Sequence, residues 1–139
     1  MSTSTMQSRS APPLGRLTPV LIVDEVEPCL QFWIERFGLT PESEVPGDNG
    51  KLVFGIVKRG DVEIMYQTRA SVLADRPADS AELVGHSTAL FITTEDLNAV
   101  ERALEGVPVV QPRHKTFYGS EEIYVREPGG NTMGFAQFT

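Results

Sequence analysis

The sequence consists of two similar halves, and this internal repeat restricts the possible folds more than any other feature. In each half a short strand pattern is followed by an amphipathic helix pattern and then by three further strand patterns. Asp96 follows Glu25 by 71 residues, and Gln137 follows Gln67 by 70. A repeat of this length predicts two equivalent supersecondary units, each of the βαβββ type, within one α+β domain.

The helix pattern of the first half begins after a strand expected at residues 17–23. Its apolar residues recur with helical spacing from Val26 to Phe37. Asp24 is the expected N-cap, and Glu27 three residues later completes a capping box. Gly38 stands where a helix often ends in a glycine. We therefore expect one amphipathic helix packed on a sheet, with its large apolar residues buried.

The helix pattern of the second half has the same design. Thr94 is the expected cap, the apolar face runs from Leu97 to Leu104, and Gly106 ends the helix. If both helices pack on the convex side of curved mixed sheets, Trp33 and Leu104 are buried beneath them.

The remaining segments define the expected domain organisation. Strands are expected at residues 17–23, 41–45, 51–58 and 62–67, and again at 87–93, 109–117, 121–126 and 132–138. Residues 1–15 are expected to be a disordered leader, residues 16–138 a single domain with halves 16–68 and 86–138, and residues 69–85 a connector.

Composition excludes several classes of partner. The formal net charge of −7 disfavours nucleic acid, whose phosphates it repels, and would mildly attract cationic small molecules. No apolar run is long enough for a membrane span, and the first residues lack a secretory signal pattern. Cys29 is the single cysteine, so no internal disulfide forms, which fits a cytoplasmic protein. Its place on the apolar helix face favours a small core residue.

Several local motifs occur in a characteristic order. Residues 20–24 (VLIVD), followed by Phe32-Trp33 and Phe37-Gly38-Leu39, look like an opening strand and helix of the "FY…LGF" type. Residues 125–131 (VREPGGN) resemble a "v-x-D-P-d-G-N" turn, and Tyr118-Gly119 is similar to a "W-G" pair. Together these motifs resemble the vicinal-oxygen-chelate superfamily of glyoxalases, bleomycin-resistance proteins and extradiol dioxygenases.

The resemblance implies two curved sheets that form a cup, commonly in a homodimer. It also implies four metal-ligand positions, which fall at Thr18, Ile64, Ala89 and Gly134. Three of these have no side-chain donor, so we expect no metal and no other cofactor. A register one residue away would turn Glu63 and Met65 into the cup and Ile64 and Tyr66 out of it. His86 and His114 are expected to have ordinary surface or hydrogen-bonding roles.

The expected site is therefore a cup lined by aromatic and polar side chains. The candidate ligand-binding residues are Phe54, Glu63, Tyr66, Arg113, Phe117, Tyr118, Glu122 and Tyr124. They favour a metal-free protein that sequesters an aromatic or cationic compound. Two alternatives stay open. The first is an enzyme, either a metal-dependent or an acid–base lyase, dioxygenase or isomerase; the acid–base form would use Glu63, Tyr66 or Tyr118. The second is a scaffold whose cup is filled by its own side chains and whose surface binds another protein.

Overall fold

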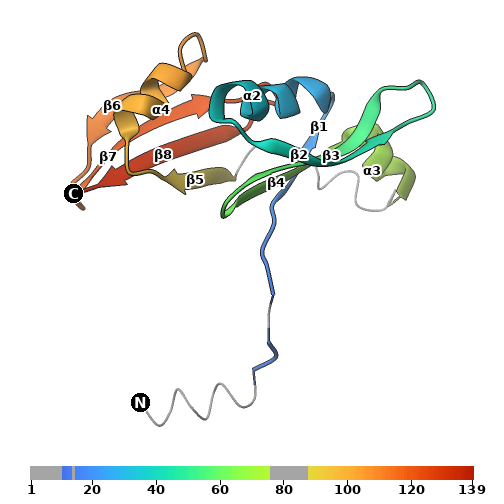
Figure 1. Ribbon diagram of the computed structural model, residues 1–139, viewed down its shortest axis with the longest axis horizontal. Coiled ribbons are helices and arrows are strands. Elements are labelled where there is room, and N and C mark those ends of the chain that lie inside the picture. Colours follow the sequence, from blue (N-terminus) through green and yellow to red (C-terminus); the bar gives the residue numbers. More distant parts are fainter. Residues whose placement is uncertain (1–10, 14, 76–87) are drawn as a thin grey trace.

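The computed structural model describes residues 11–13, 15–75 and 88–139. Its strands form two four-stranded sheets, ordered β1-β4-β3-β2 and β5-β8-β7-β6 (Figure 1). The element bounds are β1 Val20–Val23, α2 Glu27–Phe37, β2 Thr40–Pro46, β3 Leu52–Arg59, β4 Val62–Thr68, α3 Arg69–Asp75, β5 Ala89–Thr93, α4 Leu97–Ala103, β6 Val109–Lys115, β7 Ser120–Arg126 and β8 Thr132–Phe138. Both halves have the same strand order, which confirms the α+β class and the two βαβββ units.

Some expected segments lie outside the described residues. These are most of the leader at residues 1–15, residues 76–85 of the connector, and His86. The part of the connector that is described forms α3, which lies beside β1 and β4.

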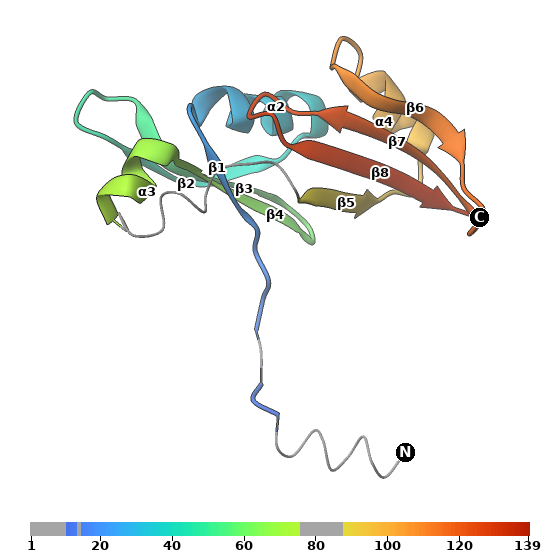
Figure 2. The same ribbon diagram turned by 180° about the vertical axis from the view of Figure 1, so that it is seen from behind.

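Helices α2 and α4 each pack on one face of their own sheet and meet across the boundary between the two sheets (Figures 1 and 2). Trp33 on α2 is 1% exposed, and Leu104 at the end of α4 is 4% exposed, so the expected burial of both is confirmed. Cys29 is also fully buried, as expected for a core residue. No helix in the described part of the chain has both the length and the hydropathy that spanning a bilayer requires.

The N-terminus of α2 differs from the expected capping box. The helix has no side-chain cap: Asp24 accepts a hydrogen bond from Arg69, and the Glu27 carboxylate accepts one from the backbone N–H of Leu52 at 2.6 Å. Both carboxylates thus accept hydrogen bonds from donors 25 or more residues later in the chain, and the local sequence spacing does not predict such partners. The expected C-terminal glycine is confirmed, because Gly38 has a φ of 67° and its N–H bonds back into the helix.

The cap of α4 lies two residues later than expected. Asp96 is the N-cap, and its side chain accepts from the Ala99 N–H at 3.1 Å. Thr94 accepts from the Asp96 N–H instead, which orients the capping residue. Gly106 lies beyond the helix end, in the following turn, with a φ of 84°.

A buried hydrogen-bond chain joins the two halves. The indole N–H of Trp33 donates to the Tyr66 hydroxyl at 2.9 Å, and this hydroxyl donates to the Glu127 carboxylate at 2.6 Å. The backbone N–H and side-chain amide of Asn131 also donate to Glu127, at 2.7 and 3.1 Å. Burial, followed by the nearby Glu127 charge, raises the pKa of the Tyr66 hydroxyl, so it remains a donor. Trp33 and Tyr66 belong to the first half, and Glu127 and Asn131 to the second.

Strand alternation divides each sheet into a helix-covered face and an opposite face, which we call the open face. On β4, Ile64 and Tyr66 are buried on the α2 side, so Glu63 and Met65 point to the open face. The second of the two registers considered from the sequence is therefore the one found. The interpretation that placed Ile64 in the cup is wrong, because this side chain packs in the core.

The repeat offset is not kept in the last strands. Gln67 lies on the face opposite to Tyr66, whereas the Gln137 side chain accepts from the Leu97 N–H at the start of α4, on the helix-covered face. The reason is the connection before each strand. A tight turn at Gly60 joins β3 to β4, while a longer loop, residues 127–131, joins β7 to β8.

One outer strand of each sheet, β2 in the first and β6 in the second, pairs irregularly with its neighbour. The β2–β3 register shifts twice, and the β6–β7 register also shifts twice. Every residue of β2 is exposed. Regular pairing joins the other three strands of each sheet, which hold the side chains of the open faces in place.

Candidate functional site

Aromatic side chains gather on the open face of the second sheet. Phe91 on β5 and Phe138 on β8 have ring centroids 6.4 Å apart, and Tyr118 lies 6.3 Å from Phe138. All three are about half exposed, at 50%, 52% and 50%. Phe117 contacts Tyr118 edge-on at the tip of the β6–β7 hairpin and is 99% exposed. The sheet thus presents an apolar surface of a kind that marks binding sites.

A carboxylate lies within this surface. Glu122 on β7 is 1% exposed, and three hydroxyl groups donate hydrogen bonds to it. Tyr118 and Ser120 donate to Oε2 at 2.6 and 2.8 Å, and Tyr124 donates to Oε1 at 3.0 Å. Ser120, Glu122 and Tyr124 alternate along one strand, so their side chains share the open face. The site is therefore assembled mainly by a single strand.

The hydroxyl groups keep this carboxylate charged. Burial alone would raise the pKa of Glu122, but the hydrogen bonds from Tyr118, Ser120 and Tyr124, with the nearby His114, outweigh it and leave the pKa below its usual range. Burial and the bond to Glu122 raise the pKa of Tyr124 to about 12. Donors and acceptor thus keep their roles throughout the neutral range.

Glu122 has no ion-pair partner among the described residues. Arginine pairs form with Glu63, Asp24, Glu101 and Glu121, but no lysine, arginine or histidine nitrogen lies within ion-pair distance of Glu122. His114 lies opposite Glu122 on β6, and its Nδ1 faces the backbone oxygen of Pro112. A buried ionised carboxylate without a cation is an unusual arrangement, because burying an unpaired charge is costly. Here three hydroxyl donors, rather than a cation, offset the burial of the charge.

Gly134 makes room for the ring of Tyr124. A Cβ atom at this position would lie 2.3 Å from Cε2 of Tyr124. The two residues are direct neighbours across β7 and β8. Any larger residue at position 134 would displace the ring that donates to Glu122.

The open face of the first sheet carries a separate polar group. Thr18 donates to Glu63 at 2.7 Å, and Arg16 donates to both carboxylate oxygens at 3.2 Å. These bonds, that from Thr18 first, lower the pKa of Glu63. Phe54 and Met65 lie on the same face and are partly buried. Glu63 and Phe54 thus share the open face of the first sheet, whereas Glu122 lies on the second sheet.

Two of the candidate residues lie away from both open faces. Tyr66 is fully buried in the core, where it links Trp33 to Glu127. Arg113 bonds Glu121, and also Asn98 and Glu101 of the α4 region, on the helix-covered face. Their residue types suited a ligand site, but strand alternation turns them toward the helices.

The four positions implied for metal ligands do not form a donor set. Ile64 is in the core, and Glu63, which points to the open face in its place, is bonded by Thr18 and paired with Arg16. Ala89 and Gly134 have no side-chain donor atom. Within residues 11–75 and 88–139, apart from the undescribed position 14, no three His, Cys, Asp or Glu side chains are grouped closely enough to hold a metal ion. The described donors therefore do not fit a divalent cation of the kind the resemblance implies.

The ligand-binding set expected from the sequence lacked four residues of the cluster around Glu122: Phe91, Ser120, Gly134 and Phe138. The alternation of Ser120, Glu122 and Tyr124 was a signal that could have identified the cluster around the carboxylate. Phe91 and Phe138 become neighbours only through the parallel pairing of β5 and β8, for which the sequence carries no local mark.

Comparison with known proteins decides the family. Residues 14–135 match the family model described as Glyoxalase/Bleomycin resistance protein/Dioxygenase superfamily. The chain belongs to this superfamily. Among curated proteins, the uncharacterized protein Rv0887c of Mycobacterium tuberculosis is 24% identical over 124 residues, which cover 87% of this chain and 73% of the relative.

Solved structures of the superfamily share the fold. The lactoylglutathione lyase of Agrobacterium tumefaciens superposes with a TM-score of 0.69 at 21% identity, covering 91% of this chain and 96% of the lyase. TnmS3, an antibiotic binding protein from Streptomyces sp. CB03234, gives a TM-score of 0.67 at 20% identity, covering 93% and 99%. The superfamily fold thus serves both a lyase and a binding protein, so the site must decide between these uses.

Proposed function

We propose that the protein binds a small organic cation with an aromatic body, without a metal, on the open face of the second sheet. The observation that carries the proposal is Glu122, a buried carboxylate that three hydroxyl groups keep ionised and that forms no ion pair with any described lysine, arginine or histidine. Aromatic rings beside it, Phe91, Tyr118 and Phe138, offer flat apolar contacts and cation–π partners. The antibiotic-binding TnmS3 is a superfamily precedent for sequestering an organic compound.

The charge of Glu122 is expected to determine affinity for such a ligand. Ethidium, a planar aromatic cation with permanent charge, is a suitable fluorescent probe. The Glu122→Gln variant keeps the shape and loses the charge, so it should bind ethidium about tenfold more weakly. Fluorescence titration measures the dissociation constant.

The matched control is Glu121→Gln. Glu121 is adjacent on β7 but points to the helix-covered face, where it pairs with Arg113. The Glu121→Gln variant removes the same net charge. An equal loss of ethidium affinity in both variants would therefore mean that only the overall charge of the protein matters. Equal affinity of wild type and Glu122→Gln would contradict the proposal, as would failure of the wild type to bind the probe.

Cation binding should show a specific pH dependence. The folded-state pKa of Glu122 lies below the ordinary glutamate value of about 4.3. Ethidium affinity should therefore stay constant from pH 8 to pH 5 and fall only below about pH 4.3, as the carboxylate gains a proton. The ionised Glu122 carboxylate also contributes to the free energy of unfolding at pH values above about 4.3. This contribution is lost as the pH falls through the lowered pKa of Glu122. Titrations at half-unit steps check this, and a midpoint near pH 6 would implicate a histidine instead.

The protein is expected to carry no stoichiometric zinc, nickel, iron or manganese. In the register found, the implied ligand positions provide at most the Thr18 hydroxyl and the Glu63 carboxylate, which Arg16 already pairs, and these are too few donors to hold a divalent ion. Elemental analysis after purification without a histidine tag should find well under one metal per chain, and EDTA should leave the melting temperature unchanged. One metal per chain, lost on chelation with several degrees of melting temperature, would favour the enzyme alternative.

A further inference from the structure

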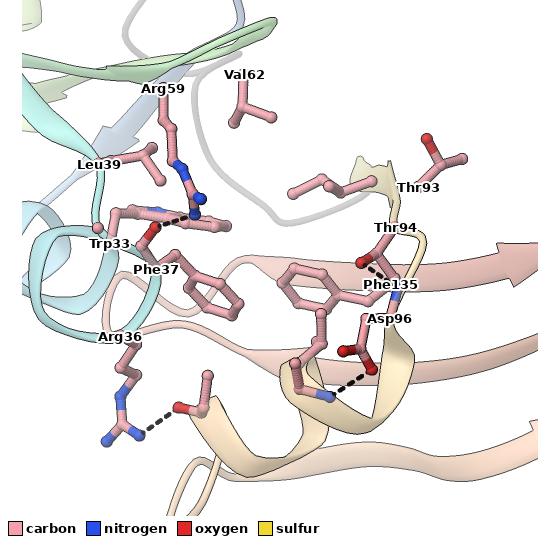
Figure 3. Close-up of a pocket in the computed structure, with 15 residues that line it drawn as sticks. Trp33, Arg36, Phe37, Leu39, Arg59, Val62, Thr93, Thr94, Asp96 and Phe135 are labelled. Atoms are coloured by element: carbon pink, nitrogen blue, oxygen red, sulfur yellow. Dashed lines mark hydrogen bonds between the residues drawn. The ribbon is translucent and has the colours of Figure 1, made fainter.

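A cavity lies on the helix-covered side, between α2 and α4. It is a groove of about 630 Å³, within the range of small-molecule sites. Figure 3 shows its two walls, with Trp33, Arg36, Phe37 and Leu39 on one side and Thr94 and Asp96 on the other. None of its lining residues takes part in the cluster around Glu122, which faces the opposite side of the second sheet.

The floor of the groove is apolar and aromatic. Phe37 from α2 stacks on Phe135 from β8, with ring centroids 5.3 Å apart and planes within 13°. Trp33, Ile92 and Val100 continue this surface on either side. Phe135 is 2% exposed, so the floor belongs to the fixed core of the fold. The backbone beneath the groove is therefore fixed, and Phe37, which is partly exposed, offers the aromatic surface that a ligand would contact first.

The wall formed by α2 and β3 is cationic. Arg59 donates to the Phe37 carbonyl at 2.9 Å, and Arg36 donates to the carbonyls of Ala103 and Glu105 at 3.0 and 2.8 Å. Each guanidinium thus uses one nitrogen on neutral backbone oxygens. Among the described residues, no carboxylate lies within ion-pair distance of either group. Both retain donors for an anion, in a chain whose net charge is −7.

Among the described residues that line the groove, the one carboxylate is at the other wall. Asp96 accepts from the Ala99 N–H as the cap of α4, and in Figure 3 it lies across the groove from Arg59. The groove is therefore polarised, with its positive side on α2 and β3.

We propose that this groove is a second binding site, which takes a small organic anion with an aromatic body. The body lies over Phe37 and Phe135, and the carboxylate or sulfonate meets Arg59. This site is separate from the proposed cation site in position and in the charge that it selects.

The probe that tests this is 8-anilinonaphthalene-1-sulfonate, paired with uncharged 1-anilinonaphthalene, which has the same aromatic body. The sulfonate should bind the full-length protein about tenfold more tightly than the neutral compound, as expected for one charge-assisted contact. In Arg59→Met this preference should vanish. Ala99→Leu and Ala103→Leu fill the groove and should weaken both compounds at least tenfold, with a melting curve to confirm that each variant is folded.

Two controls separate this groove from the open face. Arg102→Met removes one charge from the exposed side of α4, outside the groove lining, and should leave sulfonate binding unchanged. Glu122→Gln should also leave it unchanged. The proposal is overturned if Arg59→Met and both folded leucine variants bind the sulfonate as the wild type does, or if the charged and neutral compounds bind the wild type equally.

Discussion

Replacing Glu127 with alanine is expected to lower the free energy of unfolding by about 3–5 kcal/mol, the largest single-residue effect that we foresee. Glu127 is 2% exposed and accepts from the Tyr66 hydroxyl and from two nitrogens of Asn131. Removing it leaves these buried donors without their acceptor and opens a cavity at the contact between the halves. Urea unfolding followed by tryptophan fluorescence measures the change.

Two comparison variants define the origin of this loss. Tyr66→Phe removes one member of the chain and leaves the Trp33 N–H without its acceptor, so it should cost about 1–3 kcal/mol. Glu105→Ala removes an exposed carboxylate and should stay within about 0.5 kcal/mol of the wild type. A loss for Glu127→Ala no greater than for Glu105→Ala would show that the buried chain does not stabilise the junction.

Introducing a charge on the open face should abolish dimer formation. We expect the wild type to be a homodimer, with about twice the 15.3 kDa mass of the chain, because both open faces expose apolar side chains. These include Val20, Val45, Phe91 and Phe138, each 44–52% exposed. We expect the two open faces to enclose the Glu122 site between the chains, so that Phe91 lines both the ligand and the interface. In a symmetric dimer Phe91→Glu acts twice and buries two unpaired charges, so the dissociation constant should rise at least about a thousandfold.

Light scattering after size exclusion, at micromolar protein, measures the mass of each variant. Val109→Glu is the matched control, because Val109 is 53% exposed but pairs with Val125 on the helix-covered face. It should remain dimeric. A wild type that is stably monomeric at these concentrations would contradict the expectation, as would a dimer that Phe91→Glu leaves intact.

The repeat was enough to predict the order of strands and helices, because each half repeats the same apolar periods. It did not determine which side of β4 faces the cup. The side that faces the cup depends on the number of residues in the preceding turn. A register shift of one residue places Glu63 in the cup instead of Ile64. Neither was the contact of Glu127 with Tyr66 predictable, since it joins positions 61 residues apart. Glu122 and Tyr124 were identified from residue type and strand position, whereas the role of Gly134 required the packed ring of Tyr124.

The irregular outer strands have a consequence for how copies of this chain can associate. A sheet edge with regular unpaired N–H and C=O groups is a template for another strand, and chains then add without limit. On β2 the prolines at positions 41 and 46 lack an N–H, and Glu42 and Glu44 place like charges side by side on any incoming copy. Pro112 interrupts β6 in the same way. Strand addition is therefore disfavoured at the β2 and β6 edges, which lowers the tendency of these two edges to seed fibrous aggregation at high concentration.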